Sequence, residues 1–86
     1  MNLLKSGVLA DNTPVTVNVG GNTAPMTATL NSSAPGRLIE LSSDGGGTFY
    51  TPARDAEIGS MINVAILAPV SHVRFTGVTL DKWQVR

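Results

Sequence analysis

Residues 38–52, LIELSSDGGGTFYTP, look more like a chemical motif than any other stretch of the chain, because three glycines follow an acid. A phosphate-binding loop requires a lysine and a serine or threonine after the glycines, and then a helix. A calcium-binding loop requires several oxygen ligands at alternate positions. Here Thr48, Phe49 and Tyr50 follow the glycines, and Asp44 is the one acid in the loop. The pattern therefore favours a bend in which Asp44 opens the turn and glycine adopts positive φ.

His72 is the single histidine, which excludes a metal site built from several histidines of one chain. It could act as a general base for Ser71, but no G-x-S-x-G motif accompanies the pair. A hydrogen-bonding role at a surface or interface is the favoured interpretation, with His72 and Arg74 on one polar face of a strand. The sequence thus predicts no catalytic residue, no metal site and no cofactor.

Charged residues are few, at 14% of 86 residues against roughly 25% in typical soluble domains. The formal net charge is +0 and the basic residues do not cluster, so a nucleic acid is not an expected partner. Zero net charge also removes the self-repulsion that keeps monomers apart, which favours self-association. Glu40 is expected to form a cross-strand ion pair with Arg37, Arg54 or Arg74.

The chain contains no cysteine, which rules out disulfides and thiolate metal sites and favours an intracellular origin. The first residues lack the pattern of a secretory signal, and no apolar run approaches the length of a membrane span. We therefore expect neither export nor insertion into a membrane.

Alternation of apolar and polar residues predicts short β-strands along the whole chain. The predicted strands comprise residues 15–19, 26–30, 37–42, 48–51, 61–68, 71–76 and 78–85. Residues 61–68 are apolar on both alternating sets, which predicts a central strand covered on both faces, with Ile62, Val64 and Ile66 facing the core. The opposite set, Met61, Ala65 and Leu67, is expected to face either the other side of the core or a partner. At most one helical turn is expected, at residues 52–57.

These elements predict an all-β fold, a small antiparallel β-sandwich or barrel of about seven short strands. A single domain covers residues 1–86, with residues 1–12 as an arm or an edge strand. Phe49 and Phe75 are expected in the core. Trp83 is expected either to seal the sandwich or to meet a neighbouring molecule.

Two segments carry a resemblance to a known group of proteins: residues 39–46, IELSSDGG, with Phe49 and Tyr50 after them, and residues 69–77, PVSHVRFTG. From Val15 onward the chain resembles the small β-sandwich virion proteins of tailed bacteriophages, which serve as head-decoration, head-fibre or tail-associated subunits. The resemblance implies a non-enzymatic structural role without catalytic residues. It further implies a homo-oligomer, a trimer, that binds the major capsid protein or a tail protein. The expected location is the virion, after synthesis in the host cytoplasm.

The residues expected to meet a neighbour are apolar residues near the two ends and two polar residues of one strand: Leu3, Leu4, Trp83, Val85, His72 and Arg74. A small carbohydrate-binding or adhesion module is the alternative function. Such a module would bind a sugar saturably and change the fluorescence of Trp83 or Tyr50.

Overall fold

Eight β-strands form in the part of the chain that the computed structural model describes, which comprises residues 5–20, 25–52 and 56–86. The strands are β1 (Lys5–Val8), β2 (Val15–Asn18), β3 (Met26–Asn31), β4 (Leu38–Ser42), β5 (Ala56–Ile58), β6 (Met61–Ile66), β7 (His72–Thr76) and β8 (Lys82–Val85). No helix occurs among these residues. The predicted all-β fold is confirmed.

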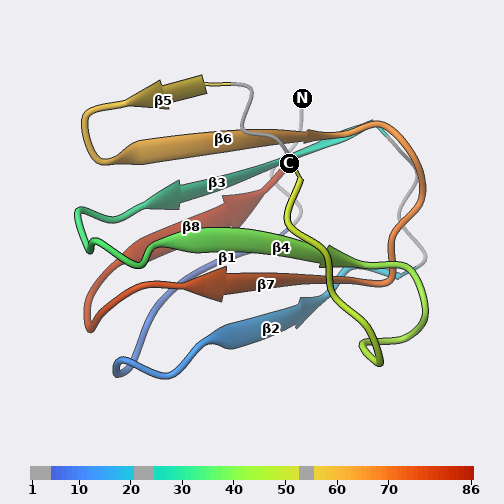
Figure 1. The fold of residues 1–86 in the computed structure, drawn as a ribbon, viewed down its shortest axis with the longest axis horizontal. Coiled ribbons are helices and arrows are strands. Elements are labelled where there is room, and N and C mark those ends of the chain that lie inside the picture. Colours follow the sequence, from blue (N-terminus) through green and yellow to red (C-terminus); the bar gives the residue numbers. More distant parts are fainter. Residues whose placement is uncertain (1–4, 21–24, 53–55) are drawn as a thin grey trace.

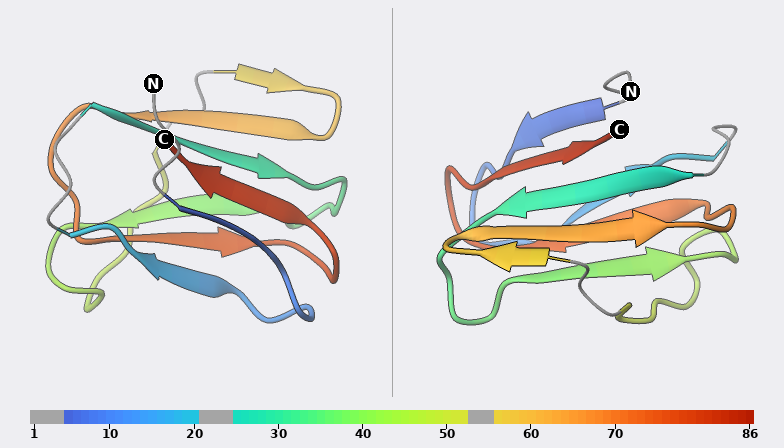
Figure 2. Two further views of the ribbon diagram at one scale, coloured as in Figure 1. Left: turned by 180° about the vertical axis from the view of Figure 1, so that it is seen from behind. Right: turned by 90° about the horizontal axis from the view of Figure 1, so that it is seen from above.

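The strands form two antiparallel sheets that pack face to face as a small β-sandwich (Figure 1). One sheet has five strands in the order β1-β8-β3-β6-β5, and the other has three in the order β2-β7-β4. Among these neighbours only β5 and β6 follow each other directly along the chain, and every other connection leads from one sheet to the other. The first and last described strands, β1 and β8, consequently lie side by side (Figure 2).

The core lies between the sheets and consists of the apolar residues that alternate along each strand. From the five-stranded sheet come Met26, Ala28, Leu30, Ile62, Val64, Ile66 and Val85, and from the other sheet come Val17, Ile39, Leu41, Val73 and Phe75. The ring of Phe75 stacks on Trp83 with centroids 5.3 Å apart, which joins the two sheets. Burying each such aliphatic or aromatic side chain contributes roughly 1.5–3 kcal/mol before entropy is counted.

The two faces of β6 have different surroundings. Ile62, Val64 and Ile66 are fully buried, so their predicted position in the core is confirmed. On the opposite face Met61 is exposed, and so is Leu67 just after the strand, at 80%. The prediction that this opposite set faces the other side of the core is therefore wrong, and a partner on this face stays a prediction. A two-layer sandwich covers only the inner face of each sheet, even where a strand has neighbours on both edges.

Two further predictions near the glycine loop are wrong. Residues 48–51 do not form a strand, and only Tyr50 makes an isolated bridge to Leu41. The expected helical turn at residues 52–57 is absent where the structure describes it, because Ala56 and Glu57 belong to β5, while residues 53–55 lie outside the described residues. Pairing with β6 through a two-residue turn at Gly59 and Ser60 overrides the helix-start pattern.

Candidate interaction surface

The outer face of the three-stranded sheet carries a line of polar side chains from paired strands. Arg74 lies between Thr16 and Glu40 in the pairing register, and His72 lies between Asn18 and Ser42. His72 and Arg74 thus share one face, as predicted. Both are partly buried there, which leaves them less accessible than a freely exposed side chain.

Arg74 is held by two partners on this face. Its Nε donates to Oε1 of Glu40 and its Nη2 to Oε2, each at 2.9 Å, which confirms Arg74 as a cross-strand partner of Glu40. Arg54, another predicted partner, lies outside the described residues. Its guanidinium also lies 4.0 Å from the centre of the Phe49 ring. Phe49 therefore stacks on the outer face, and its predicted position in the core is wrong. The hydrogen bonds that Arg74 donates to the Glu40 carboxylate raise the pKa of Arg74. A bidentate, stacked arginine of this kind fixes the strand register and is not free to bind an anion.

The glycine loop after β4 is a closed turn around the Asp44 carboxylate. Oδ1 of Asp44 accepts a hydrogen bond from the Thr48 backbone N–H at 2.9 Å and one from the Ser42 hydroxyl at 2.8 Å. These bonds, first the one from Thr48, lower the pKa of Asp44. Gly45 and Gly46 have φ values of 81° and 93°, a region that favours glycine. The predicted bend is confirmed, with Asp44 as its cap.

Ser71 and His72 are in contact, but the contact fastens the glycine loop to β7. Nδ1 of His72 lies 3.0 Å from Oγ of Ser71. That hydroxyl accepts from the Gly45 backbone N–H at 2.9 Å and lies 3.1 Å from the Ser42 carbonyl oxygen. The direction of the Nδ1–Oγ bond depends on the His72 tautomer, and in either direction the Ser71 hydroxyl stays in contact with the glycine loop and with β4. The arrangement is that of an anchor.

Metal-binding side chains do not gather in the described residues: no three His, Asp or Glu side chains lie close enough there to hold an ion. Nor does that part of the chain contain a helix that could cross a membrane.

The four apolar residues predicted to meet a neighbour fall into three groups. Leu3 and Leu4 lie outside the described residues. Val85 is 0% exposed in the core, so its prediction as an interface residue is wrong for the folded chain, because β8 lies between β1 and β3 and turns this side chain inward. Trp83 is partly buried and closes the side of the sandwich by stacking on Phe75.

Three apolar residues that the sequence analysis did not select gather at one end of the sandwich. Val8 at the end of β1 is 51% exposed, and Val78 and Leu80 in the turn before β8 are 41% and 75% exposed. The Leu80 N–H donates to the Leu9 carbonyl at 2.9 Å, which places the turn beside the end of β1. We call Val8, Val78 and Leu80 the apolar tip.

Hydrogen bonds from several directions hold the turn of the apolar tip. Oδ2 of Asp81 accepts from the Val78 N–H at 2.7 Å and from the Ser32 hydroxyl at 2.5 Å. Oδ1 of Asn12 accepts from the Thr79 N–H at 3.0 Å. Leu80 is held at a φ of 72°, which costs a residue other than glycine about 1–2 kcal/mol.

Alternation of apolar and polar residues does not predict this turn, because residues 78–85 fit the pattern of one strand. β8 begins only at Lys82, since the Val78 carbonyl accepts the Asp81 N–H at 3.1 Å and closes the chain into a turn. Gly77 followed four residues later by Asp81 is the signal that could have revealed it, because an aspartate that caps a backbone N–H is typical of turns.

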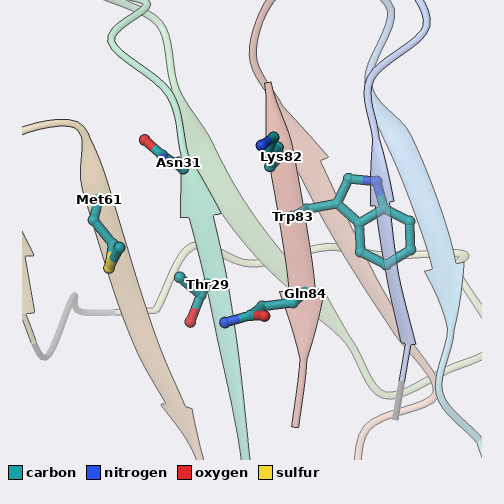
Figure 3. Close-up of a pocket in the computed structure, with 6 residues that line it drawn as sticks. All are labelled: Thr29, Asn31, Met61, Lys82, Trp83 and Gln84. Atoms are coloured by element: carbon teal, nitrogen blue, oxygen red, sulfur yellow. The ribbon is translucent and has the colours of Figure 1, made fainter. Parts of the chain in front are cut away.

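A shallow hollow lies on the outer face of the five-stranded sheet. Its lining residues are Thr29, Asn31, Met61, Lys82, Trp83 and Gln84 (Figure 3). The hydroxyl of Thr29 donates to the Asn63 side chain at 2.8 Å, and the Asn31 side chain accepts from Ser60 at 2.6 Å. Figure 3 shows the indole of Trp83 beside the hollow and over β1. Most of the exposed surface of the hollow is apolar, and hydroxyl, amide and ammonium groups lie at several points around it.

Comparison with known proteins finds no family model, no curated protein and no solved structure that matches this chain.

Proposed function

We propose that the chain is a non-enzymatic β-sandwich subunit that acts by binding protein in a larger assembly, and that this assembly is a bacteriophage particle. The observation that carries the binding role is the apolar tip, three exposed apolar side chains on and beside a turn whose backbone is held by hydrogen bonds. The phage setting rests on the resemblance of residues 39–50 and 69–77 to virion proteins. The partner is then a major capsid protein or a tail protein.

The geometry of the tip suits a docking contact because the backbone of the turn is already ordered before a partner binds. Association loses about 0.5–1.5 kcal/mol for each flexible side chain that it immobilises. Here the backbone on either side of Leu80 is already fixed by Leu9, Asn12 and Asp81. Leu80 has a strained backbone conformation and a side chain in solvent. Burial of this side chain against a partner would offset the free-energy cost of the strain. The proposed subunit therefore presents a formed apolar contact to its partner.

The variant Leu80→Asn tests the tip directly. Asparagine tolerates positive φ better than leucine, so we expect the folded chain to be as stable or more stable. Without the apolar side chain, binding to its partner should weaken. The measurement is co-sedimentation of the purified chain with phage particles from cells that carry the gene, together with mass spectrometry of those particles.

Leu67→Asn is the matched control, because Leu67 is equally apolar and 80% exposed but lies at the end of β6. It should leave co-sedimentation unchanged. The proposal is contradicted if the chain is absent from particles and does not co-sediment with them, and the tip is excluded if the two variants behave alike.

A carbohydrate-binding module is the second candidate, and the hollow on the five-stranded sheet favours it. Hydroxyl and amide side chains such as Thr29, Asn31 and Gln84 are groups that exchange hydrogen bonds with sugars. Saturable binding of a glycan, followed by the fluorescence of nearby Trp83 and lost in Gln84→Ala, would establish this function. A glycan array without a saturable ligand would contradict it.

A further inference from the structure

We infer that two copies of this chain associate by pairing their β1 strands across a two-fold axis, so that two five-stranded sheets become one continuous sheet. The inference deepens the self-association expected of a virion subunit and depends on the proposed function for its setting alone. It names the surface and the symmetry, and a two-fold pair differs from the trimer that the resemblance implies.

The hydrogen bonds at the end of β1 show which of its residues face β8. The Leu9 N–H donates to the Asp81 carbonyl at 2.8 Å. Antiparallel strands use alternate residues for their ladder bonds, so Gly7 and Lys5 also face β8. The N–H and C=O groups of Ser6 and Val8 therefore point away from the sheet. In Figure 2, β8 lies on one side of β1 and no strand of the same sheet lies on the other.

The same alternation is confirmed from the other side of β8. Thr27 and Arg86 exchange two backbone hydrogen bonds of 2.9 Å, which directs Arg86, and by alternation Gln84, toward β3. Trp83 then faces β1 and bonds Gly7, its partner in the register. Two donors and two acceptors of β1 thus remain for another strand.

The other sheet edges in the described residues are better protected. Leu41 and Tyr50 exchange two hydrogen bonds of 2.9 Å along the free side of β4. At the β2 edge the Asn18 carbonyl accepts a hydrogen bond from the ammonium group of Lys5. Pro14, just before the strand, has no N–H. β5 is three residues long. Short strands, prolines and lysines are the usual protection of edges. At β1 the lysine instead points across the sandwich to Asn18.

The free groups of β1 are self-complementary about Gly7. When two antiparallel β1 strands meet with Gly7 opposite the partner's Gly7, Ser6 of each copy faces the partner's Val8. Each of these two pairs exchanges two backbone hydrogen bonds, so all four free groups of both copies are used. Glycine at the axis places no side chain between the strands.

Trp83 and the apolar tip lie beside this axis. A methyl group at Gly7 would lie 2.6 Å from Cζ2 of Trp83, so the indole covers the place where a side chain would be. The two indoles therefore come close together in the pair, and each loses exposure. Val8 of the apolar tip lies on the outer face and is covered beside Ser6 of the partner. Apolar burial thus accompanies the backbone bonds.

Light scattering over a wide concentration range tests the pair. We expect the wild type to have twice the 8.9 kDa chain mass at high concentration. Val8→Pro removes an N–H that the folded monomer does not use, so the chain should fold and remain monomeric. Thr16→Pro is the matched control at the β2 edge: the Val19 N–H bonds the Ser71 carbonyl at 2.9 Å, so by alternation the Thr16 N–H also points away from its sheet. This control should still dimerise.

Hydrogen exchange of the wild type gives a second measurement that needs no variant. The Ser6 and Val8 amides should exchange slowly at dimer concentrations and at least tenfold faster on dilution. A wild type that is monomeric at all concentrations, a trimer, or a dimeric Val8→Pro overturns the inference. A monomer that still co-sediments with particles overturns the β1 pair and leaves the proposed function intact. A β1 dimer that does not co-sediment with particles supports the pair and contradicts the proposed function.

Discussion

At the scale of single residues, Asp44 is the group whose charge matters most for the glycine loop. Its carboxylate accepts hydrogen bonds from Thr48 and Ser42, which lower its pKa in the folded chain relative to about 3.9 in the unfolded chain. A lowered folded pKa means that Asp44 stabilises the fold fully above the unfolded value. This contribution is lost as pH falls through the folded pKa.

We therefore expect Asp44→Asn to be less stable than the wild type at neutral pH, with a difference that shrinks as the solution becomes more acidic than about pH 4. Urea unfolding at several pH values measures this, and an NMR titration of the Asp44 carboxyl carbon measures the pKa itself. Ser43→Ala, at an exposed position of the same loop, serves as the control. A constant difference between wild type and Asp44→Asn across the acidic range would contradict the role of the charge.

Gly7 lies where the indole of Trp83 leaves no space for a side chain. A Cβ there would approach Trp83 to 2.6 Å, whereas a Cβ at Gly36 meets nothing within 4 Å. Gly7→Ala should displace the indole and destabilise the fold by about 1–3 kcal/mol, as overpacking does. Gly36→Ala should leave stability nearly unchanged. Thermal unfolding and the Trp83 emission maximum report both effects, and equal behaviour of the two variants would contradict the close approach.

At the scale of elements, β6 shows how strongly its two faces differ. Ile62→Ala should cost about 2–5 kcal/mol, because it leaves a cavity between the sheets. Leu67→Ala, at an exposed position just after the strand, should change stability by no more than about 0.5 kcal/mol. Val64→Asp would bury an unpaired charge and should prevent folding. Denaturant unfolding ranks the variants, and a soluble, cooperatively folding Val64→Asp would overturn the assignment of the inner face.

The elements also show what the sequence could predict. Alternation located β2, β3 and the inward set Ile62, Val64 and Ile66, because the inside of a sandwich selects apolar residues at every second position. It failed at residues 78–85, where Val78 and Leu80 read as strand residues although side-chain bonds from Asp81 and Asn12 close a turn. One of these bonds comes from Asn12, which is distant in sequence, and the other from Asp81, which caps the turn. A periodic pattern of apolar residues predicts neither bond.

At the scale of the whole molecule, some apolar residues near the two ends are buried and others are exposed, and composition alone does not distinguish them. Val85 and Trp83 were expected to reach a neighbour, yet β8 lies inside the five-stranded sheet and turns both toward the core. Near the two ends of the described chain, the apolar tip and the free side of β1 remain exposed. Pairing of β8 with both β1 and β3 decides this, and that pairing joins strands from opposite ends of the described chain.

This pairing of the first and last strands also determines when the five-stranded sheet can be completed during translation. The ribosome makes β1 first among the described strands and β8 last. At about 5–20 residues per second, β1 waits several seconds for its neighbour, and β3 lacks one of its two partners for almost as long. The nascent chain therefore spends most of its synthesis as a gapped sheet. The five-stranded sheet can be completed only after β8 has been made, and until then the β1 backbone is open to chaperones or to a second nascent chain on the same messenger.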